Sequence, residues 1–167
     1  MHSIAPHWLN FIDGQWTDNE QHLGINNPGT SEPVATIAQA SIADAERALQ
    51  AARRCADSGE LTQCRPAQRV TWLLEIAAQI RAVVEEGAWV LCQENGKSLA
   101  DSRDEFIEAA RYFEYYAGMA DKIEGKSIPL GNGYMDFTVY DPMGVSLQIV
   151  PWNFPVSICA RSLAPAL

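Results

Sequence analysis

A short loop near the end of the chain carries the side chain best placed for chemistry. The segment Pro151-Trp152-Asn153-Phe154-Pro155 follows an apolar run, residues 145–150, that predicts a strand. The two prolines fix their own φ and bias the residues before them toward extended conformations, so the Asn153 amide has little freedom. A loop that leaves a strand and enters a helix is where open α/β sheets bind ligands. Asn153 is therefore a candidate for chemistry.

Two roles fit an asparagine at this place. Its amide N–H groups could stabilise negative charge that develops on a carbonyl oxygen, a contribution of about 3 to 4 kcal/mol in a dry site. Alternatively, Asn153 could cap the helix that begins at Pro155, because asparagine is a preferred capping residue. From spacing alone, the capping interpretation is favoured.

Composition excludes several classes of protein. The chain has 167 residues, 47% of them hydrophobic, and a net charge of −9 with twelve scattered Lys and Arg. This fits one globular unit and argues against a nucleic-acid partner. No apolar run reaches the roughly 18 residues of a membrane span, and the start resembles no signal peptide, so we expect a cytoplasmic protein. The four cysteines show no metal-type spacing, with each other or with a histidine, so we expect free thiols and no metal.

The elements that must position the loop can be predicted in outline. Residues 9–17 place Asp13-Gly14 between β-prone runs and predict a hairpin, and Val34 to Ala38 predict another strand. A first helix is expected from a capping motif at Ser41, a second from Pro66, and a third from a capping box, Ser102 to Glu105. Their predicted core faces are Ile42, Ala45, Leu49, Ala52 and Ala56; Val70, Leu73, Leu74, Ala77 and Val84; and Phe106, Ala110, Phe113, Ala117 and Ala120.

After Gly125 the helical periodicity stops. Ile128 to Tyr140 predict two extended pieces joined around Gly131-Asn132-Gly133. Because a ribbon of two strands is marginal alone in water, we expect it to pair with something else.

Several motifs in order along the chain resemble the aldehyde dehydrogenase superfamily. They are Phe11-Ile12-Asp13-Gly14-Gln15-Trp16, Asn27-Pro28-Gly29-Thr30, Glu94-Asn95-Gly96-Lys97, Tyr115-Tyr116-Ala117-Gly118, Ala120-Asp121-Lys122-Ile123-Glu124-Gly125, Asp141-Pro142-Met143-Gly144-Val145, the loop at 151–155, and Leu163-Ala164-Pro165-Ala166-Leu167. The resemblance covers essentially the whole chain.

The resemblance implies an α/β fold, the N-terminal part of an aldehyde dehydrogenase. Residues 1–125 would form the hairpin and helical part of the NAD-binding domain, 126–143 an oligomerisation β-ribbon, and 144–167 the first β-α unit of a Rossmann-like parallel sheet. The implied reaction is oxidation of a small aldehyde to a carboxylic acid with NAD or NADP, through a cysteine thiohemiacetal, in a homo-oligomer.

The resemblance also implies roles for individual residues. Asn153 matches the asparagine that donates to the oxyanion, which reverses the preference for a helix cap. The cofactor-binding segment is matched by Ile149, Val150, Pro151, Trp152 and Asn153. Phe154, Ile158 and Arg161 are the candidates for contact with substrate.

Two elements of the family's chemistry are missing. The nucleophilic cysteine in a Gly-Gln-x-Cys context and the general base in a Glu-Leu-Gly-Gly context do not occur, so the chain alone is not expected to turn over aldehyde. We interpret it as a fragment of an enzyme. The alternative is a non-catalytic module that associates with full-length subunits through the ribbon.

Arg161 suggests a class of substrate. It lies three residues after Ile158 and shares its helix face, and it resembles the arginine of semialdehyde dehydrogenases, whose guanidinium can pair with a substrate carboxylate. We therefore expect an aldehyde that carries an acid group. Equally, Arg161 could extend to solvent or pair with another carboxylate of the protein.

Overall fold

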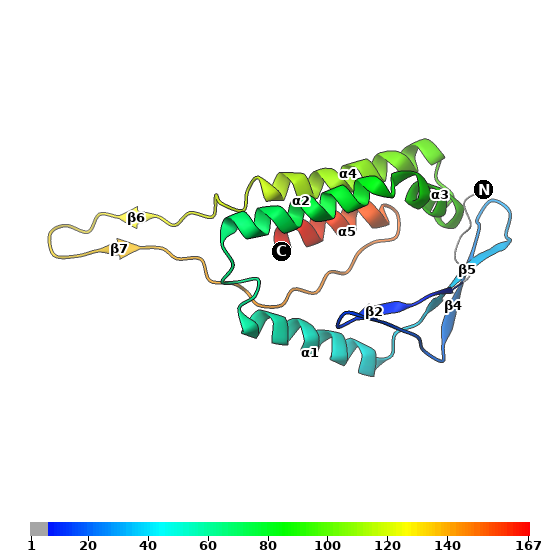
Figure 1. Ribbon diagram of the computed structural model, residues 1–167, viewed down its shortest axis with the longest axis horizontal. Coiled ribbons are helices and arrows are strands. Elements are labelled where there is room, and N and C mark those ends of the chain that lie inside the picture. Colours follow the sequence, from blue (N-terminus) through cyan, green and yellow to red (C-terminus); the bar gives the residue numbers. More distant parts are fainter. Residues whose placement is uncertain (1–6) are drawn as a thin grey trace.

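The computed structural model describes residues 7–167 (Figure 1). Its N-terminal part is built from short strands. β1 (His7–Trp8), β5 (Pro33–Ala38) and β4 (His22–Asn26) form one sheet in that order, with β1 parallel and β4 antiparallel to β5. β2 (Asn10–Ile12) and β3 (Gln15–Thr17) form the predicted hairpin. Its turn residues Asp13 and Gly14 have φ of 53° and 75°, the left-handed conformation that a two-residue hairpin loop requires.

The helices follow, and the second, third and last of them pack on the fourth. They are α1 (Ile42–Ser58), α2 (Pro66–Ala82), α3 (Val84–Asn95), α4 (Leu99–Ala117) and α5 (Pro155–Leu163), which continues into the short 3-10 helix η1 (Ala164–Ala166). Figure 1 shows α2, α4 and α5 side by side. The core is formed by Leu73, Ala77, Ala109, Ala110, Phe113, Ala117, Ala160 and Ala164. Small residues dominate this core, which lets the helices approach closely.

Three helix predictions need correction. The predicted core face of α1 is open to solvent, with Ile42 82% and Leu49 59% exposed, because the main contacts of α1 are with β2. Val84 begins α3 instead of continuing α2, since the backbone breaks at Val83. The cap of α4 is Ser98, whose Oγ accepts from the Asp101 N–H. The pattern of a serine followed three residues later by an acidic residue occurs twice here, as Ser98 with Asp101 and as Ser102 with Glu105. The first of these pairs marks the start of α4.

The ribbon is confirmed as a hairpin with short paired arms. β6 (Ser127–Ile128) pairs antiparallel with β7 (Asp136–Phe137), and Gly131 and Gly133 adopt positive φ at its tip. Figure 1 shows the ribbon extending away from the helices. It therefore exposes apolar side chains that no described element covers: Leu130, Tyr134, Met135, Phe137, Val139 and Tyr140.

The predicted strand at residues 145–150 was wrong for this structure. The segment is extended chain without ladder hydrogen bonds, and Leu147 and Ile149 are 84% and 88% exposed. A strand exists through its pairing with a neighbour, and the described residues offer this segment none. The helix that was expected after the loop is present as α5.

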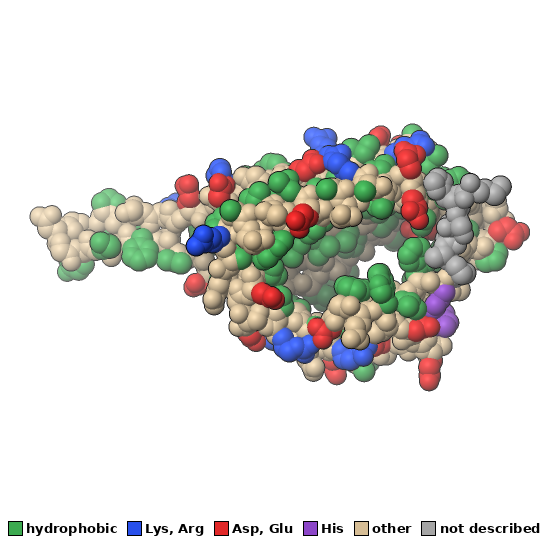
Figure 2. Space-filling view, viewed as in Figure 1, with side chains coloured by type: hydrophobic (Ala, Val, Ile, Leu, Met, Phe, Trp, Pro, Cys, Tyr) green, Lys and Arg blue, Asp and Glu red, His purple; other side chains and the backbone are tan. Residues whose placement is uncertain are grey.

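Two further expectations concern the chain as a whole. Within the described residues, no helix is long and apolar enough to cross a membrane. All four cysteines are free, as predicted. Figure 2 shows basic side chains scattered over the face in view, among acidic ones.

Candidate functional site

The start of α5 is capped by a buried carboxylate from another helix. The N-cap residue is Phe154, whose side chain makes no capping hydrogen bond. Instead, Oε1 of Glu105 on α4 accepts from the backbone N–H groups of Val156 at 2.8 Å and Ser157 at 3.2 Å. A negative charge at the start of a helix also interacts favourably with the helix dipole. Asn153 is therefore not needed as the cap of α5.

A lysine ties this carboxylate to the candidate loop. Lys97 Nζ forms an ion pair with Oε2 of Glu105, and only 12% and 1% of the two side chains are exposed. The same ammonium donates to the carbonyl oxygen of Asn153 at 3.0 Å and lies 4.3 Å from the centre of the Phe154 ring. Asn95 adds a hydrogen bond of 3.0 Å to the carbonyl oxygen of Trp152.

These contacts hold the loop by its backbone. Two consecutive carbonyl groups, those of Trp152 and Asn153, accept from side chains at the end of α3 and in the turn after it. The residue Asn153 itself is exposed. Its amide is thus carried on an anchored backbone and is not used as a helix cap.

The turn that carries Lys97 depends on a glycine. Gly96 ends α3 in the left-handed conformation, with φ of 80°, and a Cβ at this position would lie 2.6 Å from Cγ of Pro28. The motif Glu94 to Lys97 is thus a helix end and turn. Its lysine also positions the loop, a role that the sequence prediction missed.

Glu105 was missed as well, although the sequence contains a signal for it. Glu105, Ala109 and Phe113 lie four residues apart, so they share one face of α4, and all three are buried. A glutamate on an apolar helix stripe is costly unless it is paired. Such a residue is therefore expected to have a structural partner, and here the partners are α5 and Lys97.

The residues predicted to bind cofactor are largely open. Ile149 and Trp152 are 88% and 81% exposed, Pro151 is also exposed, and Val150 is half-buried. Trp152 and Asn153 are bound to the end of α3 and to the turn after it, whereas Ile149 makes no core contact within the described residues.

The predicted substrate residues lie at the loop and along α5. Phe154 lies under the Lys97 ammonium, Ile158 is half-buried, and Arg161 is exposed. Between them, burial raises the pKa of the Cys159 thiol. A raised pKa leaves less thiolate at neutral pH, so Cys159 has the opposite of what a nucleophile needs.

Comparison with known proteins decides the family. Residues 16–167 match the model of the aldehyde dehydrogenase family. The chain belongs to this family. Among its relatives, betaine aldehyde dehydrogenase of Bacillus subtilis is 38% identical in an alignment of 161 residues that covers 94% of this chain and 33% of that protein. Aldehyde dehydrogenase family 2 member B4 of Arabidopsis thaliana is 39% identical over 98% of this chain and 31% of that protein.

Solved structures agree with this assignment. Betaine aldehyde dehydrogenase of Staphylococcus aureus, in complex with NAD+, superposes with a TM-score of 0.91 at 33% identity over 96% of this chain. The match covers 33% of that structure. The chain thus has the α/β architecture of the N-terminal part of an aldehyde dehydrogenase and spans about a third of the length of its relatives.

Proposed function

We propose that this chain provides the oxyanion donor of an NAD(P)-dependent aldehyde dehydrogenase, with Asn153 as that donor. The observation that carries the proposal is the anchored loop. Glu105 and Lys97 fix the start of α5 and the Asn153 carbonyl, while Asn153 remains exposed. When a nucleophile adds to an aldehyde, the carbonyl oxygen becomes negative, and a fixed amide N–H stabilises that charge.

The residues near the loop fit one wall of a cofactor cleft. Ile149 and Trp152 present apolar surface that nothing in the described part of the chain covers, and such surface suits a nicotinamide ring or ribose. Val150, Pro151 and Asn153 continue this wall. Bound NAD or NADP would supply the hydride acceptor of an aldehyde oxidation. This chain's contribution would be to orient the cofactor and to bind the carbonyl oxygen.

The nucleophile and the base are not assigned to residues of this chain. The relatives' greater length leaves room for both groups, and the raised pKa of the Cys159 thiol argues against this cysteine. The proposed activity is therefore that of a complete protein that contains this chain. The test is whether that protein oxidises aldehydes with NAD or NADP, measured as the rise in absorbance of the reduced cofactor.

Arg161 supports an aldehyde that carries an acid group. Its exposed guanidinium lies one helical turn after Ile158, on the helix that begins at the candidate loop. Replacing it by leucine, Arg161→Leu, should lower kcat/KM for an acidic aldehyde by about tenfold or more and leave a neutral aldehyde of the same length within about threefold. Equal losses for both aldehydes would contradict this substrate assignment.

The ribbon supports assembly into a homo-oligomer. Its apolar side chains, including 61% exposed Phe137 and 68% exposed Val139, lie on a two-stranded hairpin that is marginal in isolation. We propose that residues 126–143 pair with another subunit. Light scattering on the complete protein should show an oligomer that Phe137→Lys weakens, and an unchanged oligomer would oppose the assignment.

The alternative function uses the same ribbon. In it, the 167-residue chain is a non-catalytic module that associates with full-length subunits. The intact mass of the native protein separates the two: a mass about three times larger supports the enzyme, since the chain covers 33% of its relative.

The free thiols agree with a cytoplasmic location, which cell fractionation can test.

A further inference from the structure

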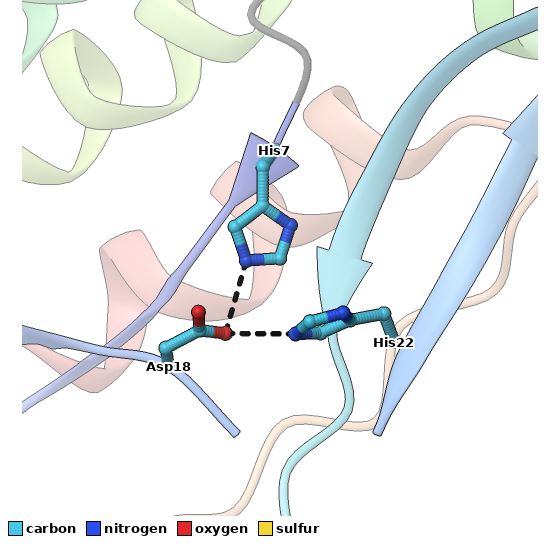
Figure 3. A group of neighbouring side chains, drawn as sticks. All are labelled: His7, Asp18 and His22. Carbon is cyan, nitrogen blue, oxygen red and sulfur yellow. Dashed lines mark hydrogen bonds and ion pairs between the residues drawn. The ribbon is translucent and has the colours of Figure 1, made fainter. Parts of the chain in front are cut away.

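Two histidines and an aspartate converge at one side of the N-terminal sheet, away from the candidate loop in sequence (Figure 3). Nε2 of His7 lies 2.9 Å and Nε2 of His22 lies 3.1 Å from the same oxygen, Oδ1 of Asp18. All three candidate ligand atoms lie within 4.8 Å of one another. The proposed aldehyde chemistry uses none of these residues.

The strand register explains why the histidines meet. His7 on β1 pairs with Thr36 of β5, and His22 on β4 pairs with Ala38 of the same strand. Thr36 and Ala38 are two residues apart, so the side chains at both positions point to the same face of the sheet. Their cross-strand partners do the same. The central strand thus holds the two imidazoles on one face, and Asp18, just after β3, closes the group.

The His7 ring is held in place from behind. Its Nδ1 lies 2.8 Å from Oγ1 of Thr36, so the hydroxyl fixes the orientation of the ring that directs Nε2 toward Asp18. Metal-binding histidines commonly have such a partner on the second nitrogen, which sets the tautomer and leaves Nε2 free to bind the metal. The two rings meet edge to face with centroids 4.5 Å apart, which limits their freedom further.

We propose that His7, Asp18 and His22 form a binding site for a divalent transition-metal ion of the zinc type. Two imidazoles and one carboxylate are a ligand set that suits this class of ion. Bonds of about 2.0–2.2 Å at tetrahedral angles place neighbouring ligand atoms about 3.4 Å apart. The two nitrogen–oxygen distances of 2.9 and 3.1 Å are already close to this spacing, so binding needs only small side-chain movements.

The charge at the site is also suitable. Asp18 contributes a carboxylate oxygen, a ligand that suits a divalent cation beside two imidazole nitrogens. The side chains of His7, Asp18 and His22 are 28%, 52% and 42% exposed, which leaves room for water as further ligands. A bound ion would link β1, the segment after β3, and β4.

The direct test is a titration of metal-free, untagged protein with Zn²⁺ in which calorimetry measures the binding. We expect one site per chain, and we expect His22→Gln and Asp18→Asn each to weaken binding at least tenfold. Thr36→Val should weaken it about tenfold, the lower end for loss of a residue that orients a ligand. The matched control is His2→Gln, which removes the chain's third histidine, a residue outside the described range, and should bind as the wild type does.

Thiols are the main competing ligands, and the variants control for them because each keeps all four cysteines. Co²⁺ in place of Zn²⁺ should give a spectrum without a thiolate charge-transfer band. Nitrogen NMR provides a test on the wild type alone. Zn²⁺ should shift the resonances of Nε2 of His7 and His22 and leave those of His2 unchanged. Any one of three results overturns the proposal. The wild type does not bind Zn²⁺, or His22→Gln and Asp18→Asn both bind it with wild-type affinity, or the Co²⁺ spectrum shows a thiolate band.

Discussion

Replacing Glu105 by glutamine, Glu105→Gln, tests how the candidate loop is held. The side chain of Glu105 is 1% exposed, and its carboxylate accepts two backbone N–H groups of α5 and pairs with Lys97. Glutamine keeps the shape but loses the charge. The two hydrogen bonds to α5 then become neutral, which costs about 1 kcal/mol each, and the amide –NH₂ group faces the Lys97 ammonium.

The expected loss is about 3 to 5 kcal/mol in the free energy of unfolding, the usual cost of removing one partner from a buried ion pair. Urea denaturation measures it, and hydrogen exchange at the Val156 and Ser157 amides reports the local effect. Glu108→Gln is the matched control, because Glu108 lies on the same helix with a side chain 45% exposed and should lose less than about 0.5 kcal/mol. A loss for Glu105→Gln no larger than that of the control, with unchanged amide exchange, would refute the reasoning.

Two further predictions concern the packing of α3 and the titration of Asp18. Gly87→Ala should destabilise the protein by about 1 to 3 kcal/mol in thermal unfolding, because the new Cβ would lie 2.3 Å from the Phe106 ring. Helix propensity alone would predict the opposite, a stabilisation. The control is Gly24→Ala, because a Cβ at Gly24 would have no atom within 4 Å. The pKa of Asp18, lowered from 3.8 to about 2 chiefly by its hydrogen bond from His7, means that this carboxylate stabilises the fold above about pH 4 and loses that contribution as the pH falls toward 2. Carbon NMR should show a titration midpoint near pH 2 that rises in His7→Gln; a midpoint near 3.8 in the wild type would contradict the structure.

Local signals in the sequence predicted the local structure well. The hairpin at Asp13-Gly14, the capping box at Ser41 and the helix start at Pro66 each depend on a few neighbouring residues, and all three are confirmed. The strand at residues 145–150 failed because pairing, not composition, makes a strand. The face of α1 at Ile42 and Leu49 was predicted as core for a similar reason: periodicity identifies an apolar face but not what covers it.

The candidate site shows the same division. Motif resemblance indicated Asn153, but not how its loop is supported. Glu105 and Lys97 are eight residues apart in the sequence. The loop and helix start that they contact lie more than 45 residues further along the chain. A contact of this kind depends on how α4 and α5 pack, which no short pattern encodes. A charged residue on the apolar stripe of α4 was the available sign.

The role of Asn153 as oxyanion donor is tested most directly by Asn153→Ala in the complete protein. The exposed side chain supports neither the cap of α5 nor the core, so folding should be preserved, as circular dichroism can verify. Steady-state aldehyde oxidation at saturating cofactor should then show kcat reduced about 100- to 1,000-fold. A kcat within about threefold of the wild type would show that Asn153 does not stabilise the transition state.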